Sequence, residues 1–448
     1  MLYRLTFGCG IHSLIYHLRI QHYLEFKGNL MPMNIRIRGA AFACLAMMFI
    51  ALPLSAEELT LRQAVELAVA NNPTIAAGQL SAQAAKQTAI GAKSLTNPEI
   101  LVAPSVVGDA GSDSAVLFSQ PLEINGSRKI RGNIASHQAK ASGFDADITT
   151  RDIVLRVSQT YWDTARAQEL VKLNQDNVQY LDTVKAAVQK QYDVGAVPGA
   201  QLLKMDVELA RANQELAQAQ LELSVSKSEL NSLMGWCAAS DFVLSEPMTF
   251  QDVTFDRSAM LNAAKTNRPE ISSANSLLSA ARSQIKAAHV QRIPDIALQA
   301  RRETFDPDSD GGVAIAVTLP LIDWGSTKAE KRSAAASAQS QEKQLEAVCN
   351  KVSLDVEQAV ARVNTASQIV RDYESGILTK SEDLATMARK GYEKGANNYL
   401  ELLEAQRTLR STRSAYYSAL AEHAKAIVQL EWAAACSVPQ TSNSEVKN

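Results

Sequence analysis

The sequence is poor in the features that mark most specialised classes of protein. Its 448 residues include only five cysteines and thirteen prolines, which excludes a disulfide-rich scaffold and a proline-rich or collagen-like chain. The formal net charge of −2 provides no basic surface for nucleic acid, and we expect no nucleic-acid partner. Aromatic residues make up 6% of the chain, few for a conventional globular core. With 46% hydrophobic residues, the chain is nevertheless too apolar to be disordered throughout.

Long apolar runs are also scarce, and the one that stands out lies near the N-terminus. Residues 39–52 are apolar, follow two arginines, and precede the small residues Ser55 and Ala56. This order of basic, apolar and small residues is typical of a secretory signal cleaved after Ala56. A transmembrane anchor is the alternative, but a helix needs about 20 apolar residues to span a bilayer. The pattern therefore favours export.

We assign residues 1–56 to a leader and signal peptide, whose true start is Met31 or Met33 if the first 30 residues are not translated. Its removal takes away five basic residues and one acidic residue, which lowers the net charge to −6. Three cysteines then remain, enough for one disulfide at most. The candidate pair is Cys237 and Cys436, and free thiols are the alternative.

After the predicted signal peptide, the same sequence pattern occurs twice. Residues 71–75 (NNPTI) recur as 267–271 (NRPEI), and residues 98–100 (PEI) recur as 294–296 (PDI), both at an offset of 196. Landmarks repeated in the same order at nearly constant offset indicate a tandem duplication. The predicted segments after the signal are a first repeat at 57–250, a second repeat at 251–436 and a polar tail at 437–448.

Each repeat is predicted to contain one β-hairpin. In the second repeat, apolar and polar residues alternate over 296–300 and 313–319, which is the period of a strand. Turn-forming residues fill 306–312 between them, and a similar turn occupies 108–113 in the first repeat. Two hairpins give four strands per chain.

Long helices are predicted to follow the hairpins. No proline occurs between Pro121 and Pro198, and a helix over about 130–192 would be roughly 95 Å long. Apolar residues then alternate at spacings of three and four from Leu202 to Leu233, the seam of a coiled coil. Glutamates recur every seventh residue beside this seam, either as a solvated acidic face or as a stripe facing a partner or a lumen: Glu208, Glu215, Glu222 and Glu229.

The number of strands per chain limits how the hairpins could enter a membrane. Four strands cannot close a barrel, and lipid does not tolerate open sheet edges. If the hairpins enter a membrane, several chains must pool their strands, and three chains would supply twelve. The alternative is a soluble periplasmic coiled-coil protein with two small hairpin caps.

The chain resembles the TolC-like outer membrane efflux proteins. The resemblance covers most of residues 57–435 and rests on residues 59–73, on residues 119–123 (SQPLE) followed by 126–129 (GSRK), and on two Tyr-x-x-Gly-Ala turns. The SQPLE run and its basic sequel are similar to the CzcC-like heavy-metal branch. Residues 323–325 (DWG) resemble the general family instead.

The resemblance implies a mainly α fold with a small β part. A long α-helical coiled-coil barrel would cross the periplasm and join a twelve-stranded β-barrel in the outer membrane, shared by a homotrimer. The implied partners are outer membrane lipid, a periplasmic adaptor (membrane fusion) protein and an inner-membrane transporter of the RND type. The implied function is a passive exit duct of a tripartite efflux system, with heavy-metal cations as the favoured cargo. Drug efflux, type I secretion and a soluble periplasmic adaptor are the alternatives.

The two tyrosine–glycine turns would form the periplasmic tip that docks the adaptor. They occupy residues 192–196 (YDVGA) and 392–396 (YEKGA). Glycine supplies the backbone angles with which a helix ends and the chain reverses, and a plain helical hairpin is the minimal interpretation. The exposed candidates for docking are Gly195, Ala196, Val197, Pro198, Gly395, Ala396 and Asn398.

A pore constriction is expected beside the second turn. Glu401 and Glu404 share one helix face, and in a trimer they would form two carboxylate rings that attract cations. By position they resemble the paired aspartates of the family's constriction, with two solvated glutamates as the alternative. The family's arginine–aspartate tether and its tyrosine correspond here to Asn397, Gln201 and Tyr392. An Asn–Gln contact lacks charge assistance, so a closed state would be held differently.

No catalytic, cofactor-binding or metal-binding residue is assigned. The histidines after the signal are far apart and lack the spacing of metal ligands: His137, His289 and His423. No phosphate-binding loop or nucleophile motif occurs either. We therefore expect a channel rather than an enzyme, with no cofactor and with transport energy supplied by a partner.

Overall fold

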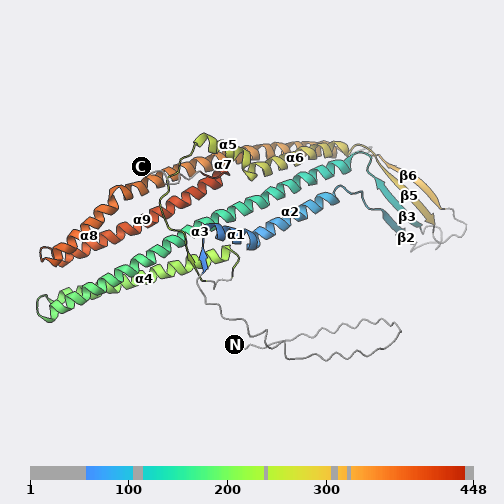
Figure 1. Ribbon diagram of the computed structural model, residues 1–448. Helices are drawn as coiled ribbons and strands as arrows, with labels where there is room; N and C mark the ends of the chain where they lie inside the picture. Colours follow the sequence, from blue (N-terminus) through green and yellow to red (C-terminus); the bar gives the residue numbers. More distant parts are fainter. Residues whose placement is uncertain (1–56, 104–114, 237–240, 304–310, 320–323, 439–448) are drawn as a thin grey trace, which may run out of the picture. The chain divides into compact units, whose positions relative to one another are not determined.

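The fold was analysed in a computed structural model (Figure 1). Chain contacts divide the protein into a unit of residues 1–55 and a compact unit of residues 56–448, and only the second contains described residues. The predicted signal peptide, the hairpin turn at 108–113, residues 306–310 of the second hairpin turn, Cys237 and most of the polar tail lie outside the described residues. The described residues are 57–103, 115–236, 241–303, 311–319 and 324–438.

The same order of elements occurs twice: two short helices, two strands, a long helix and a return helix. In the first repeat they are β1 (Glu57–Leu59), α1 (Leu61–Asn71), α2 (Pro73–Gly91), β2 (Glu99–Ala103), β3 (Ala115–Leu122), α3 (Ser127–Asp193), α4 (Gly199–Leu233) and β4 (Phe242–Leu244). In the second they are α5 (Arg257–Asn267), α6 (Pro269–Val290), β5 (Asp295–Glu303), β6 (Gly312–Thr318), α7 (Ser326–Asp372), the π-helical turn η1 (Tyr373–Ile377), α8 (Leu378–Glu393) and α9 (Tyr399–Ala434). The predicted mainly α fold with four hairpin strands is confirmed.

Local chemistry explains where the short helices begin. The Thr60 side chain accepts a hydrogen bond from the backbone of Gln63, whose own side chain caps Thr60 in return. In the second repeat the Asp256 carboxylate accepts from the backbone N–H of Ser258. Pro73 opens the next helix without loss, because the first helical N–H has no partner within the helix.

The four hairpin strands form one antiparallel sheet in the order β2-β3-β5-β6. The two repeats meet where Phe118 of β3 lies opposite Ala300 of β5. A second, parallel sheet of β1 and β4 was not predicted from the sequence, since three-residue strands carry little periodic signal. It is held in place by Tyr161, whose hydroxyl donates to the carbonyl of Leu59 at 3.0 Å.

The helices next to the sheet follow the order of its strands. Contacts join α2 to α3, α3 to α6 and α6 to α7. Helix α3 has 67 residues and is therefore about 100 Å long, close to the predicted helix. The second repeat differs, because α7 gives way to η1, where Gly376 leaves helical geometry. This interruption contains no proline, and the sequence did not reveal it.

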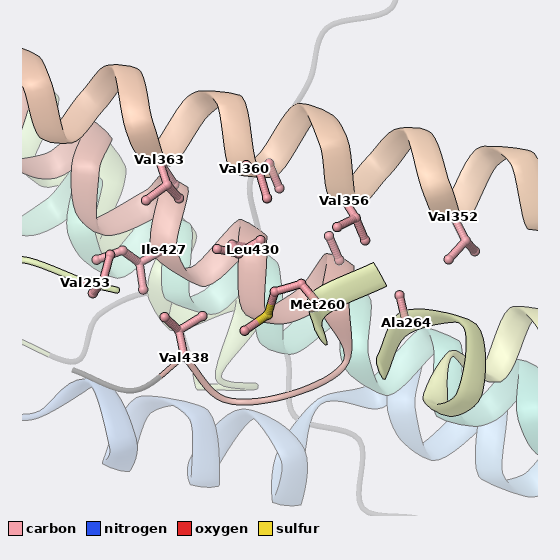
Figure 2. Packing of buried hydrophobic residues seen from close by; sticks show 14 residues of the cluster. Val253, Met260, Ala264, Val352, Val356, Val360, Val363, Ile427, Leu430 and Val438 are labelled. Carbon is pink, nitrogen blue, oxygen red and sulfur yellow. The ribbon is translucent and has the colours of Figure 1, made fainter. Parts of the chain in front are cut away.

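Small and aliphatic side chains form the helix contacts. Figure 2 shows valines spaced along α7 packing on Leu430 and Ile427 of α9 and on Met260 of α5. Val438, the second residue of the predicted polar tail, is buried in this cluster. On α4 the predicted coiled-coil seam packs on α3, and its buried members are Met205, Ala212, Ala219, Leu230 and Leu233. These packings account for the low aromatic content.

Among the residues that the structure describes, no helix is both long and apolar enough to cross a membrane.

Candidate functional site

The two helix ends farthest from the sheet close with the same turn. In the first repeat the Ala196 N–H donates to the Gln191 carbonyl and the Gly195 N–H donates to the Tyr192 carbonyl, both at 2.8 Å. This pair of bonds is a Schellman motif, which requires a left-handed residue, and Gly195 supplies it with φ of +74°. The predicted chain reversal at this glycine is therefore present.

The second repeat reproduces the turn. Its bonds run from Ala396 to Gly391 at 2.8 Å and from Gly395 to Tyr392 at 3.0 Å, with φ of +72° at Gly395. The next helix then begins at Asn398, whose side chain accepts from the Glu401 N–H at 2.9 Å. Both turns thus end one helix and start another within six residues.

The docking residues predicted from the sequence differ in exposure. Val197 is half-buried and packs on the hydrophobic cluster behind the turns, so its side chain is the least accessible of the set. The others are exposed: Gly195, Ala196, Pro198, Gly395, Ala396 and Asn398.

The hydrophobic cluster joins the two tips. Tyr399 is buried between Leu181 and Val188 of α3 and Met205 of α4, and its ring lies 6.3 Å from that of Tyr392. Burial raises the pKa of the Tyr399 phenol, whose hydroxyl has no hydrogen-bond partner in the described structure. Spacing along the sequence gives no signal for Tyr399, because the chain reverses at Gly395 and the two tyrosines lie on different helices.

Glu401 and Glu404 line a groove of about 700 Å³ between the first turns of α4 and α9. Both carboxylates are exposed, as expected for groups that meet solvent or a pore. The groove also contains three cationic side chains, so the two glutamates are not an isolated acidic field. These cations are Lys204, Arg211 and Arg407.

Arg407 crosses this groove to the first repeat. Its Nε donates to Glu208 Oε1 at 2.9 Å, and a second nitrogen donates to the other carboxylate oxygen. The arginine lowers the pKa of the Glu208 carboxyl, and the pair raises that of Arg407. Arg410 makes a similar two-bond contact with Glu215 one turn farther along.

All four glutamates of the predicted acidic stripe are paired. Beyond the two bound by α9, Glu222 pairs with Arg166, and Glu229 lies 3.9 Å from Arg156, both arginines on α3. The side chains of Glu215, Glu222 and Glu229 nevertheless remain 42–54% exposed, so the stripe also meets solvent. They form a ladder of ion pairs that ties α4 to its neighbours, which spacing in one segment could not reveal.

The two residues at the position of the family tether are not joined in this chain. Asn397 is half-buried against Gly391, and its N–H donates to the Gly391 carbonyl at 3.2 Å. Gln201 lies in the first turn of α4, and the described residues show no hydrogen bond between it and Asn397. Tyr392 instead donates to Gln191 at 3.4 Å, linking the two tips.

The histidine and cysteine side chains show no sign of metal or redox chemistry in the part of the chain that the structure describes. Within the described ranges, no three His, Cys, Asp or Glu side chains are arranged to hold a metal ion. His423 is buried, and its Nε2 lies 3.1 Å from the Ser367 hydroxyl, so it is a packed side chain. Cys436 is a free thiol 3.4 Å from the Met260 sulfur, and its proposed partner Cys237 lies outside the described residues.

Comparisons with known proteins agree with this architecture. The chain is 24% identical over 383 residues to the cobalt-zinc-cadmium resistance protein CzcC of Cupriavidus metallidurans, covering 84% of this chain and 90% of that protein. Solved structures of similar fold include CusC, with a TM-score of 0.70, 19% identity, and 85% and 92% of the two chains covered. The open state of the MtrE outer membrane channel from Neisseria gonorrhoeae gives a TM-score of 0.72 at 19% identity over 84% and 89%.

A family model described as "Outer membrane efflux protein" matches residues 64–236 and 260–435, most of the chain. The chain therefore belongs to the outer membrane efflux protein family: it is a TolC-like outer membrane channel that extends into the periplasm, and not an enzyme.

Proposed function

We propose that three copies of this chain form the exit duct of a tripartite exporter of heavy-metal cations. An inner-membrane transporter of the RND type would supply the energy, and a periplasmic adaptor would join the transporter to the duct. TolC-family channels are typically trimers within tripartite systems. The soluble periplasmic adaptor no longer applies, because the family consists of outer membrane channels.

The four-stranded sheet supports the trimer. By its register, Phe118 shares a face with Ile100, and Leu298 shares it with Ile315. This face is apolar except for Gln120 and Arg302, as a lipid-facing surface must be, and its exposed members are Ile100, Val102, Phe118, Leu122, Leu298, Val313, Ile315 and Val317. Apart from Leu101 and Leu117, the opposite face carries small and polar residues that suit a watery lumen, including Ser119, Gln299, Arg301, Ala314, Ala316 and Thr318.

The two open edges of the sheet also support an assembly of three copies. Among the described strands, β2 and β6 each have a partner on one side only. Lipid does not solvate free backbone N–H and C=O groups, so these edges need partners from other chains. Twelve strands from three chains make a closed barrel of ordinary size.

The likeness to CzcC is the observation that carries the metal cargo. It extends along both chains, and the printed name of that protein states resistance to cobalt, zinc and cadmium. The SQPLE motif adds little, because its residues build the junction between β3 and α3. There Arg131 binds the Glu123 carboxylate and the carbonyls of Ala92 and Ser94.

At the tip, the exposed turn residues would meet the adaptor, and Glu401 and Glu404 would attract cations at the entrance. Their exposure in the groove supports this role. Asn397, Gln201 and Tyr392 would then shape the constriction without a charged tether.

A deletion strain tests the cargo. Loss of the gene should raise cellular cobalt, zinc or cadmium, measured by mass spectrometry, and lower the tolerated concentration of that metal; the intact gene should restore both. Unchanged metal tolerance together with new sensitivity to organic drugs would favour drug efflux. Loss of a secreted protein would favour type I secretion.

A further inference from the structure

The four connections between the sheet and its helices each expose a large apolar side chain. These connections join α2 to β2, β3 to α3, α6 to β5, and β6 to α7. Trp324 is 93% exposed and Ile124 is 64% exposed, although neither belongs to a strand. Together these side chains form an apolar belt at the end of the sheet nearest the helices. The belt consists of Leu95, Ile124, Ile293, Leu319 and Trp324.

The connections lie at one level of the molecule. In the register of the sheet, Ile296 of β5 lies opposite both Leu122 of β3 and Val317 of β6, so the three strands reach this end together. Strands β3 and β6 are parallel to each other across β5, and each is followed by a long helix. Helices α3 and α7 therefore both begin just beyond the sheet, on either side of α6.

Basic side chains are concentrated where these two helices begin. Residues 126–132 and 325–332 include six basic residues and one acidic residue, whereas the chain after the predicted signal has a net charge of −6. Lys129, Lys328 and Arg332 are exposed. Within the part of the chain that the structure describes, none of these three side chains forms an ion pair. The positive charge is therefore available to a partner.

The order of apolar and basic residues is the same in all four connections. The basic residue always follows the apolar residue when the chain is traced from the sheet toward the helix. In this order the pairs are Leu95 and Lys93, Ile124 and Arg128, Ile293 and Arg292, and Trp324 and Lys328. Two acidic residues on the sheet side, Glu123 and Asp295, are bound by Arg131 and Asn125.

This layering matches the edge of a lipid leaflet. The apolar face of the sheet continues into the apolar belt, and acyl chains would cover both. Phosphate groups lie just outside the acyl chains, where lysine and arginine side chains bind them. Tryptophan is enriched at the same level of membrane proteins. Trp324 also has a left-handed backbone, with φ of +47°, which is unfavourable for a bulky residue and is found mostly at functional positions.

We propose that the four connections bind anionic phospholipids of the periplasmic leaflet, with the apolar belt among the acyl chains and the basic residues at the phosphates. This inference rests on the proposed exit duct and assigns its contact with lipid. Facing the lumen, the same positive charges would repel the metal cations proposed as cargo. Facing the leaflet, they would fix the depth at which the duct sits in the membrane.

Lipid binding by a charge variant tests the proposal. The full chain would be purified in detergent and titrated with phosphatidylglycerol or phosphatidylcholine, and native mass spectrometry would count the bound lipids. Combining Lys129→Gln, Lys328→Gln and Arg332→Gln should weaken phosphatidylglycerol binding at least about tenfold, because each basic group near an anionic lipid contributes about a factor of five. Binding of phosphatidylcholine should not change.

The matched control removes three exposed lysines that lie far along the helices from the sheet: Lys172→Gln, Lys351→Gln and Lys390→Gln. It should change the binding of neither lipid. Equal phosphatidylglycerol binding by the two variants, with the trimer intact by light scattering, would overturn the lipid contact and leave the exit duct in place. Unchanged lipid binding with altered ion selectivity, or with lost binding to peptidoglycan, would also overturn it. A monomer by light scattering would overturn the trimer instead.

Fluorescence quenching gives a second measurement that needs no change of charge. In vesicles of phosphatidylglycerol brominated on its acyl chains, the unmodified protein should be quenched more than Trp324→Phe. The other three tryptophans pack in the hydrophobic clusters of the helices: Trp162, Trp236 and Trp432. Equal quenching of the two proteins would show that Trp324 does not enter the leaflet and would overturn the proposal.

Discussion

Arg407 of α9 donates two hydrogen bonds to the carboxylate of Glu208 on α4, a residue 199 positions earlier in the chain. The contact ties the helical hairpin of the second repeat to that of the first, more than two helical turns above the tips. The Glu208 side chain is only 15% exposed and that of Arg407 is 45% exposed, so the pair is partly shielded from water. The two repeats thus meet through charge near the tips.

Arg407→Met should weaken the contact between the helical hairpins of the two repeats and lower the stability of the fold. We expect a loss of about 1–2 kcal/mol, since Glu208 is left without its partner but solvent reaches the pair. The melting temperature of the purified protein should fall, and the open probability in planar bilayers should rise. Arg62→Met is the control, because its side chain is 87% exposed and binds only Glu66 on its own helix. Equal effects of the two changes would show that the hairpins are not held by this contact.

The same pair sets a dependence on pH. Arg407 holds the pKa of Glu208 below its ordinary value of 4.5, so the carboxylate stabilises the fold above pH 4.5 and the contribution is lost as the pH falls through the lowered pKa. The melting temperature should therefore fall less between pH 5 and pH 3 in Arg407→Met than in the unmodified chain. Parallel curves would contradict this assignment.

His423 should give a separate response at milder pH. Burial of the imidazole, which lies beside Ser367 and the Phe250 ring, lowers its pKa below the ordinary 6.5; the positive charge of Arg371 acts in the same direction and Asp252 opposes it. The unfolded chain therefore takes up a proton first, and stability is lost as the pH falls from 6.5 to the lowered pKa. His423→Gln should reduce the drop in melting temperature between pH 7.5 and pH 5.5. An unchanged drop would show that other groups cause it.

Arg268 is expected to be among the most costly residues to remove. Its side chain is 3% exposed, binds Glu270 and Asp355, and lies 4.3 Å from the Trp432 ring. Arg268→Met leaves two carboxylates poorly paired, at a cost of about 3–5 kcal/mol. Thermal unfolding would measure this loss of stability. The control is Arg282→Met: the Arg282 side chain is 62% exposed, so its replacement should cost under about 1 kcal/mol. A loss no larger than that of the control would rule out a structural role for the buried pair.

Three glycines should respond differently to alanine. Gly195→Ala meets no atom within 4 Å and should cost only the left-handed strain, about 1–2 kcal/mol. Gly235 has φ of +74°, and an added Cβ would lie 2.6 Å from the Asn71 carbonyl oxygen, so Gly235→Ala should cost about 3 kcal/mol or more. Gly143→Ala, in the open middle of α3, should stabilise by about 0.5–1 kcal/mol. A different ranking of melting temperatures would contradict these backbone assignments.

The proposed role of Glu401 and Glu404 at the tunnel entrance can be tested by measuring ion selectivity. Glu401→Gln combined with Glu404→Gln should shift the reversal potential in a salt gradient toward anions, because two carboxylates per chain are lost beside the groove. Glu342→Gln, an exposed acid on α7 outside this groove, is the control. If the shift does not exceed that of the control, the two glutamates do not select cations.

Some features of the candidate site could be predicted from the sequence, and others could not. The two reversals at Gly195 and Gly395 were predictable, because a helix end needs a residue that tolerates positive φ. The position of Glu401 and Glu404 on one helix face was predictable from spacing. Their surroundings were not, since the cations of the groove come from α4 and α9, about 200 residues apart.

The sequence by itself determined the repeated pattern of helices and hairpin strands and the long unbroken helix, since periodicity, caps and proline spacing act over a few neighbouring residues. It also determined the resemblance to the efflux channels, which the family match confirms. Only the tertiary structure decided that the four strands share one sheet, that η1 interrupts the second repeat, and that the glutamate stripe is paired with arginines. These features depend on which distant segments pack together, and a contact between segments leaves no period in either of them.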